Sequence, residues 1–101
     1  MAEQKLVKAI SDRRVIRCMY RGHQRIGEPH LLGIEGDDLT LEIFQTGGGS
    51  ESGGLPDWRH YKVDGITQVV ALKQTFAVRP DFNVNRDRWR KIVCHVRHDA
   101  G

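Results

Sequence analysis

The sequence predicts a mainly β domain: a small five-stranded antiparallel barrel or curled sheet, with a helix before it and an extension after it. Five short segments alternate apolar and polar residues, turn residues separate them at near-even spacing, and a helical stripe precedes the first segment. The length of 101 residues allows one domain with one modest core.

A short amphipathic helix is predicted over residues 2–13. Leu6, Val7 and Ile10 have the spacing of one helical face, and polar residues after Ile10 lower helix propensity and end it. A helix of this length is marginal alone in water, so we expect it to pack against the strands.

Side-chain alternation predicts strands at residues 15–20, 25–32, 39–44, 58–63 and 66–72, with Phe76 closing the core. Gly22 suits a hairpin turn at residues 21–24. Pro29 lacks an N–H for a β-ladder, which predicts an edge position or a bend there.

Residues 46–56 hold five glycines and predict a mobile hairpin loop. The segment lacks the Gly-Lys-Ser/Thr ending of a phosphate-binding loop, and no helix is predicted after it. A phosphate cradle is therefore disfavoured.

The C-terminal extension, residues 78–101, fits two secondary structures. Trp89, Ile92, Val93 and Val96 have helical spacing, but residues 92–96 also read as a strand. We favour a short turn followed by a strand, with the extension packing on the barrel of residues 1–77.

The segment at residues 58–63 places different chemistry on its two faces. Tyr61 faces the core, and Arg59 shares that face, where a charge is unusual. Arg59 either binds an anion at the rim of the barrel or pairs with a carboxylate such as Asp57 or Asp64. Trp58, His60 and Lys62 lie on the outer face, where Trp58 either belongs to a binding surface or contacts the extension.

The composition permits an anionic partner without requiring one. Sixteen Lys and Arg against thirteen Asp and Glu give a formal net charge of +3. A cluster of basic and aromatic side chains in the extension either contacts single-stranded nucleic acid or consists of solvated charges around a Trp anchor. Its members are Arg86, Arg88, Trp89, Arg90 and Lys91.

The sequence predicts neither a membrane protein nor a secreted one. No apolar stretch approaches the roughly 20 residues of a membrane helix, and the first residues lack the apolar region of a signal peptide. We therefore expect a cytoplasmic protein in which Cys18 and Cys94 are reduced and act as small hydrophobic residues.

No motif indicates catalysis or a metal centre. Cys94, His95 and His98 are close in sequence, but a strand puts Cys94 and His95 on opposite faces, and no Cys-x-x-Cys completes a zinc site. The serines lack a nucleophile elbow. We expect no enzyme activity, no cofactor and no metal.

The order of features resembles the WYL domain, a small Sm-like or SH3-like barrel of bacterial regulators. The resemblance covers residues 5–77 and begins with LVKAISDRRVIRCMY, followed by the return strand with Glu28-Pro29. Leu39-Thr40-Leu41 stands where the family has the Trp-Tyr-Leu tripeptide that gives it its name. A later run matches at Arg59, Tyr61, Lys62, Val63, Asp64 and Ile66, and the last match is Phe76. The Trp and Tyr of that tripeptide are absent, and we expect a stand-alone member of the family, without the winged-helix domain that usually precedes this barrel.

The resemblance implies a sensing role in transcription regulation, with ligands bound by basic and aromatic residues. Carried over to this chain, it nominates Arg59 and Lys62, with Tyr20 and Tyr61 as stacking partners and Trp58 beside them.

These observations predict a binding module for an anionic ligand, with single-stranded nucleic acid or a nucleotide as the preferred ligand. The alternative is a protein-interaction module that forms a homodimer, or docks on a partner, through its edge strands.

Overall fold

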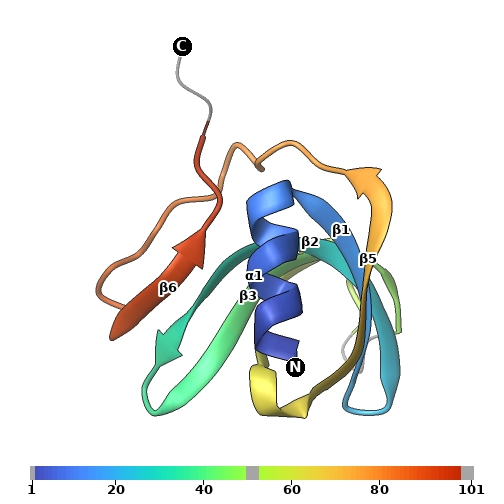
Figure 1. Ribbon diagram of the computed structural model, residues 1–101, viewed down its shortest axis with the longest axis horizontal. Helices are drawn as coiled ribbons and strands as arrows, with labels where there is room; N and C mark the ends of the chain where they lie inside the picture. The colour runs from blue at the N-terminus through green and yellow to red at the C-terminus, as the bar shows by residue number, and fades with distance from the viewer. Residues whose placement is uncertain (1, 50–52, 99–101) are drawn as a thin grey trace.

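The computed structural model describes residues 2–49 and 53–98. The order of elements there is α1 (Ala2–Asp12), β1 (Arg14–Tyr20), β2 (His23–Glu35), β3 (Asp38–Gly48), β4 (Asp57–Lys62), the 3₁₀ helix η1 (Val63–Gly65), β5 (Ile66–Thr75) and β6 (Lys91–His95) (Figure 1). The prediction of a mainly β domain with an N-terminal helix is confirmed.

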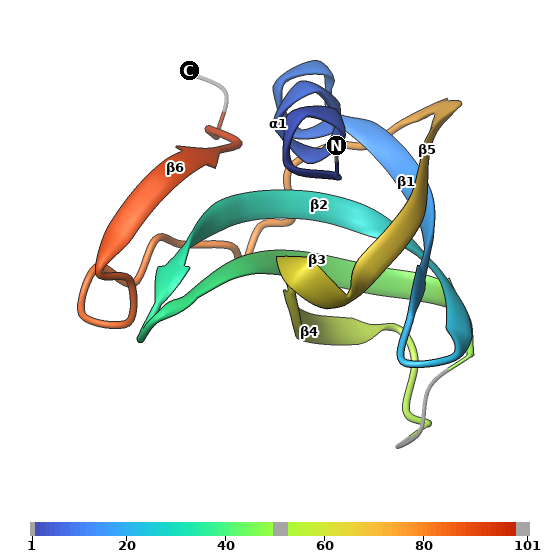
Figure 2. The same cartoon turned by 60° about the horizontal axis from the view of Figure 1, so that its bottom comes forward.

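The strands form one curled antiparallel sheet of six strands in the described part of the chain, in the order β4-β3-β2-β1-β5 with β6 also paired to β2 (Figure 2). We expected five strands, and the sixth, β6, comes from the C-terminal extension. The sheet is open: β4 pairs with β3 and β5 pairs with β1, but no ladder joins β4 to β5. The structure is therefore a curled sheet and not a closed barrel.

The long strand β2 organises the sheet because it has different partners along its length. Its first half pairs with β1 as far as Gly27, and its second half pairs with β6 from Leu31 onward. Pro29 lies between these two ladders, so its missing N–H interrupts neither of them. The register with β3 shifts beside it. The expectation of a bend at Pro29 therefore agrees with an irregularity inside the sheet.

Local sequence explains the buried face of α1 and the first hairpin turn. Leu6, Ala9 and Ile10 of α1 are buried against the sheet, as the helical stripe predicted, except that Ala9 takes the place expected for Val7. Arg21 and Gly22 have φ values of 50° and 76°, the left-handed pair that a type I′ turn needs. The predicted hairpin turn is confirmed.

The glycine-rich segment starts later than predicted because β3 continues to Gly48. The Gln45 side chain donates hydrogen bonds of 2.9 Å to the carbonyls of Gly47 and Gly49. Residues 50–52, on which the predicted mobility partly depends, lie outside the described residues.

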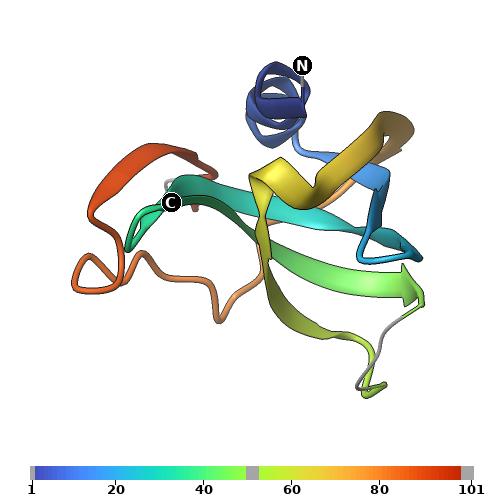
Figure 3. The same cartoon turned by 90° about the horizontal axis from the view of Figure 1, so that it is seen from below.

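The residues after β5, 76–98, form what we call the tail, and they cover the outer face of β3 and β4. Phe82 of the tail packs against Trp58, with ring centroids 5.9 Å apart. Figure 3 shows the coil between β5 and β6 on the side of the sheet opposite α1, whereas β6 itself lies in the sheet beside β2. The predicted turn followed by a strand is confirmed by β6, which pairs with β2.

Gly33 on β2 makes room for the tail. A Cβ at this position would lie 2.8 Å from Cε3 of Trp89 and 2.8 Å from the carbonyl oxygen of Lys91. We expect Gly33→Ala to lower the free energy of unfolding by about 1–3 kcal/mol, because the added methyl overpacks this contact. Urea unfolding measures the loss. Gly47→Ala is the control, since its Cβ would have no neighbour closer than 3.7 Å, and an equal loss in both variants would contradict this account.

Candidate anion-binding site

Two tyrosines stack in the core at the hairpin end of the sheet. Tyr20 ends β1 and Tyr61 lies on β4, and their ring centroids are 4.4 Å apart. Both side chains are buried, so their role in the structure is packing and no ring face is open to a ligand. The Tyr20 hydroxyl accepts a hydrogen bond of 3.1 Å from the backbone N–H of Lys62, which ties β1 to the end of β4.

Arg25 is the residue that the sequence reasoning missed. The β1–β2 register places it opposite Cys18 on the inner face, and its guanidinium lies 5.6 Å from the Tyr20 ring centroid and 5.4 Å from that of Tyr61. Nε and Nη2 donate to the Tyr20 carbonyl oxygen at 3.2 and 3.1 Å. Alternation along residues 23–27 was the available signal, because it puts Arg25 on the core face.

Arg25 is a buried cation with an exposed fraction of 5%. Its guanidinium donates to the Tyr20 carbonyl oxygen, and no carboxylate of the described residues forms an ion pair with it. Buried charges are usually paired, because desolvation is costly. The two tyrosine rings supply partial compensation through cation–π contact.

Arg59 lies on the same inner side of β4 and is half-buried. Its Nη1 pairs with the Asp57 carboxylate at 2.8 Å, and its Nη2 donates to the Gly53 carbonyl at 2.7 Å. Of the two roles that the sequence left open for Arg59, the structure forms the ion pair with Asp57. This pair is partly exposed and therefore weak and open to exchange.

Arg21 completes what we call the arginine–tyrosine cluster: Tyr20, Arg21, Arg25, Arg59 and Tyr61. Its guanidinium lies 5.4 Å from the Tyr20 ring centroid, and its side chain is exposed. Burial raises the pKa of Tyr61 to about 12, although the charges of Arg25 and Arg59 act to lower it. The phenol therefore stays protonated at neutral pH and donates to the side-chain oxygen of Gln45.

Lys62 does not belong to this cluster. It lies on the outer face of β4, where its ammonium is 3.4 Å from the Asp38 carboxylate. The structure thus separates the two residues that the resemblance had nominated together, because consecutive odd and even positions of a strand face opposite sides.

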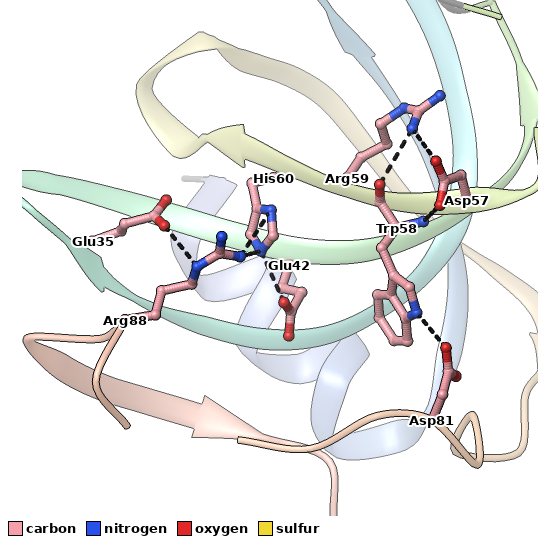
Figure 4. A network of polar contacts seen from close by, with 8 residues as sticks. All are labelled: Glu35, Glu42, Asp57, Trp58, Arg59, His60, Asp81 and Arg88. Atoms are coloured by element: carbon pink, nitrogen blue, oxygen red, sulfur yellow. Dashed lines mark hydrogen bonds and ion pairs between the residues drawn. The ribbon is translucent and has the colours of Figure 1, made fainter. Parts of the chain in front are cut away.

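Trp58 contacts the tail, which is one of the two roles that the sequence left open. Its indole N–H donates to the Asp81 carboxylate at 2.9 Å (Figure 4). Its ring packs at the edge of Phe44 with centroids 5.2 Å apart. His30, Phe82 and Phe44 surround it, so this outer face is an intramolecular interface.

Two of the four basic residues in the predicted cluster pair with carboxylates of β2 and of the β2–β3 turn. Arg88 pairs with Glu35 at 3.1 Å and contacts His60, which is 2.8 Å from Glu42 (Figure 4). Arg90 pairs with Asp37 at 3.2 Å, and Trp89 is buried. Arg86 and Lys91 are exposed. The predicted cluster is therefore divided between an anchor, two ion-paired arginines and two solvated cations.

The described residues contain no group of three side chains that could hold a metal ion. His98 donates from Nε2 to the Phe82 carbonyl, and Cys18 and Cys94 are free cysteines. Burial raises the pKa of the Cys18 thiol to about 11, which makes it a poor nucleophile at neutral pH.

Neither helical element in the described residues has the length and apolar character needed to cross a membrane. Comparison of the chain with models of known families, with curated proteins and with solved structures gave no significant match.

Proposed function

We propose that this chain is a non-enzymatic binding module for a phosphate-bearing anion, single-stranded nucleic acid or a nucleotide, at the arginine–tyrosine cluster. The observation that carries the proposal is Arg25, a guanidinium buried without a carboxylate partner among the described residues. Arg21 and Arg59 add two more cations beside it, and Asp57 is the carboxylate that pairs there.

The expected mode of ligand binding follows from which side chains of the cluster are exposed. Guanidinium groups bind phosphate through paired N–H donors, and Arg21, whose side chain is exposed, is the group that a ligand reaches first. The tyrosines hold the arginines in place and leave no open ring for a base. Phosphate contact therefore dominates, and we expect binding that depends on salt and only weakly on nucleotide sequence.

We also propose that this chain is a divergent WYL domain and that its curled sheet is a variant of the Sm-like or SH3-like fold. The strand order with a 3₁₀ turn between β4 and β5, after an N-terminal helix, is what we would expect of an Sm-like or SH3-like domain. A ligand-sensing role in transcription regulation in a bacterial cytoplasm is the function that this family would supply.

Fluorescence anisotropy with a labelled single-stranded oligonucleotide tests the proposed site. We expect Arg21→Gln and Arg59→Gln to weaken binding, and each to make the slope of log affinity against log salt about 0.7 smaller, the value for one lost phosphate contact on a single strand. Both side chains reach the surface, so the fold should survive both substitutions.

Lys62→Gln is the matched control, because it removes the same charge from the opposite face of β4. We expect it to leave the salt slope unchanged. Absence of binding at low salt, or equal weakening by Lys62→Gln and Arg59→Gln, would reject the assignment of the site.

A further inference from the structure

The strand β5 is the longest open edge of the sheet. In the described residues three strands, β4, β5 and β6, have a ladder on one side only, and β5 has ten residues against six and five for the others. Ile66 and Val69 are its buried side chains, and most of the others are exposed. Unpaired backbone groups along such an edge are a template for another strand.

Three adjoining cavities follow the side of β5 that faces α1. The first, about 430 Å³, begins at Ile66, and the last, about 350 Å³, reaches Ala71. A cavity of about 270 Å³ lies between them and shares Ile66 with the first and Val69 with the last. These cavities lie between α1 and β5 and together form a groove along this side of the strand.

The charge of this groove changes sign along β5. At the start of the strand the cavity is lined by Glu3, Asp37, Asp38 and Asp64; Asp37 and Asp38 pair with Arg90 and Lys62, so the excess negative charge there comes from Glu3 and Asp64. Toward the end it is lined by Lys5, Lys8 and Arg14, with Asp12 paired to Lys8, so the excess positive charge comes from Lys5 and Arg14. Lys73 of β5 adds another exposed cation near the basic end.

An apolar side chain lies near the middle of the edge. Val70 is 41% exposed and faces away from the groove, opposite Arg17 of β1. The other large hydrophobic side chain with comparable exposure in the described residues is Val93 of β6, at 40%. Val70 is thus an unburied apolar group at the centre of a strand whose two ends carry opposite charge.

We propose that β5 pairs with β5 of a second copy of this chain, antiparallel, about a two-fold axis near Val70. Antiparallel pairing puts the start of each strand beside the end of the other, so the acidic end of each groove meets the basic end of its partner. The same arrangement brings the two Val70 side chains together and removes them from water. This inference does not rest on the arginine–tyrosine cluster.

Two features of β5 limit pairing with other strands. Gln68 has a φ of 54° at a shift in the β1–β5 register, and the register shifts again toward Arg14. Bulges and an edge lysine such as Lys73 are devices that disfavour indiscriminate pairing. A partner with the matching shape and the reversed charge order, which a second copy supplies, is therefore favoured over an arbitrary strand.

Sedimentation velocity over a concentration series tests the dimer. We expect the parent protein to form a dimer that dissociates on dilution and with added salt. Val70→Lys and Val70→Glu should each be monomers at concentrations where the parent is a dimer, because like charges then meet at the axis. An equimolar mixture of the two variants should recover the dimer.

Val93→Lys is the control, because it places the same charge on an equally exposed valine of a different edge. It should dimerise like the parent, and circular dichroism should show that all variants are folded. A parent that stays monomeric throughout, a mixture that stays monomeric, or dissociation by Val93→Lys would each overturn the proposal.

Discussion

Replacing Trp89 with alanine is expected to lower the free energy of unfolding by about 3–5 kcal/mol, the usual cost of removing a large buried aromatic side chain. Trp89 is 6% exposed, packs on Gly33, and lies with its ring centroid 6.0 Å from that of His60. It lies two residues before β6, the strand of the tail that pairs with β2, so its loss should also loosen the tail. Urea unfolding followed by circular dichroism measures the change.

The emission of Trp58 separates loosening of the tail from a local cavity. The Trp58 indole bonds to Asp81 and packs on Phe82, both in the tail. If the tail detaches in Trp89→Ala, the remaining tryptophan emission should shift to longer wavelength. Arg86→Ala is the control, because this side chain is exposed and a surface change usually stays within 0.5 kcal/mol. A loss in Trp89→Ala no larger than in Arg86→Ala would contradict the role of Trp89 as an anchor.

Stability is expected to fall as the pH is lowered below about 6.5, because of His30. This side chain is 0% exposed and lies among the rings of Trp58, Phe76 and Phe82. Nδ1 donates to the Glu28 carbonyl at 2.8 Å, and Nε2 accepts from the Arg79 backbone N–H at 3.2 Å, so the neutral ring satisfies both bonds. Burial lowers the pKa of His30 from 6.5, although Glu28 opposes the shift.

The sign of the effect follows from proton binding. The unfolded chain binds a proton near pH 6.5 and the folded chain binds it only at lower pH, so between these values the unfolded state holds more protons. The contribution of neutral His30 to the free energy of unfolding is therefore fully present above about pH 6.5. Below that pH it decreases by at most about 1.4 kcal/mol per pH unit, the value for one proton.

Thermal unfolding of the parent and of His30→Gln at pH 7.5 and 5.0 measures this contribution. We expect the variant to be less stable at pH 7.5 and to lose less stability than the parent on acidification. His23→Gln is the control, because it makes the same substitution on the first hairpin, away from the aromatic rings that surround His30. Equal losses on acidification in the parent and in His30→Gln would show that His30 does not carry the effect.

Local patterns predicted most of the elements because their causes are local. The stripe of Leu6 and Ile10 needs only helical geometry, and the turn at Gly22 needs only a residue that tolerates positive φ. Alternation also predicted that Arg59 and Tyr61 share one face of β4 while Trp58 and Lys62 share the other. These predictions required no knowledge of distant residues.

The candidate site and the contacts of the tail were less predictable because both join distant parts of the chain, as when Tyr20 of β1 stacks on Tyr61 of β4. Arg79 of the tail bonds to Glu28, 51 positions away, and stacks over Phe44 at 4.3 Å. Arg88 reaches Glu35 across a similar separation. Alternation assigns a side chain to a face, but it does not say whether that face is exposed to solvent or covered by another segment. The sequence therefore could not decide whether Trp58 belongs to a binding surface or contacts the tail.

By itself the sequence determined that this chain forms antiparallel strands after a short helix, and which side chains share a face, because these depend on backbone geometry and neighbouring residues. Only the tertiary structure decided that the sheet stays open, that β6 joins it, and that Arg25 lies buried beside the rings of Tyr20 and Tyr61. Those outcomes depend on which surfaces remain to be buried once the sheet has curled, and that balance is set by contacts across the whole chain.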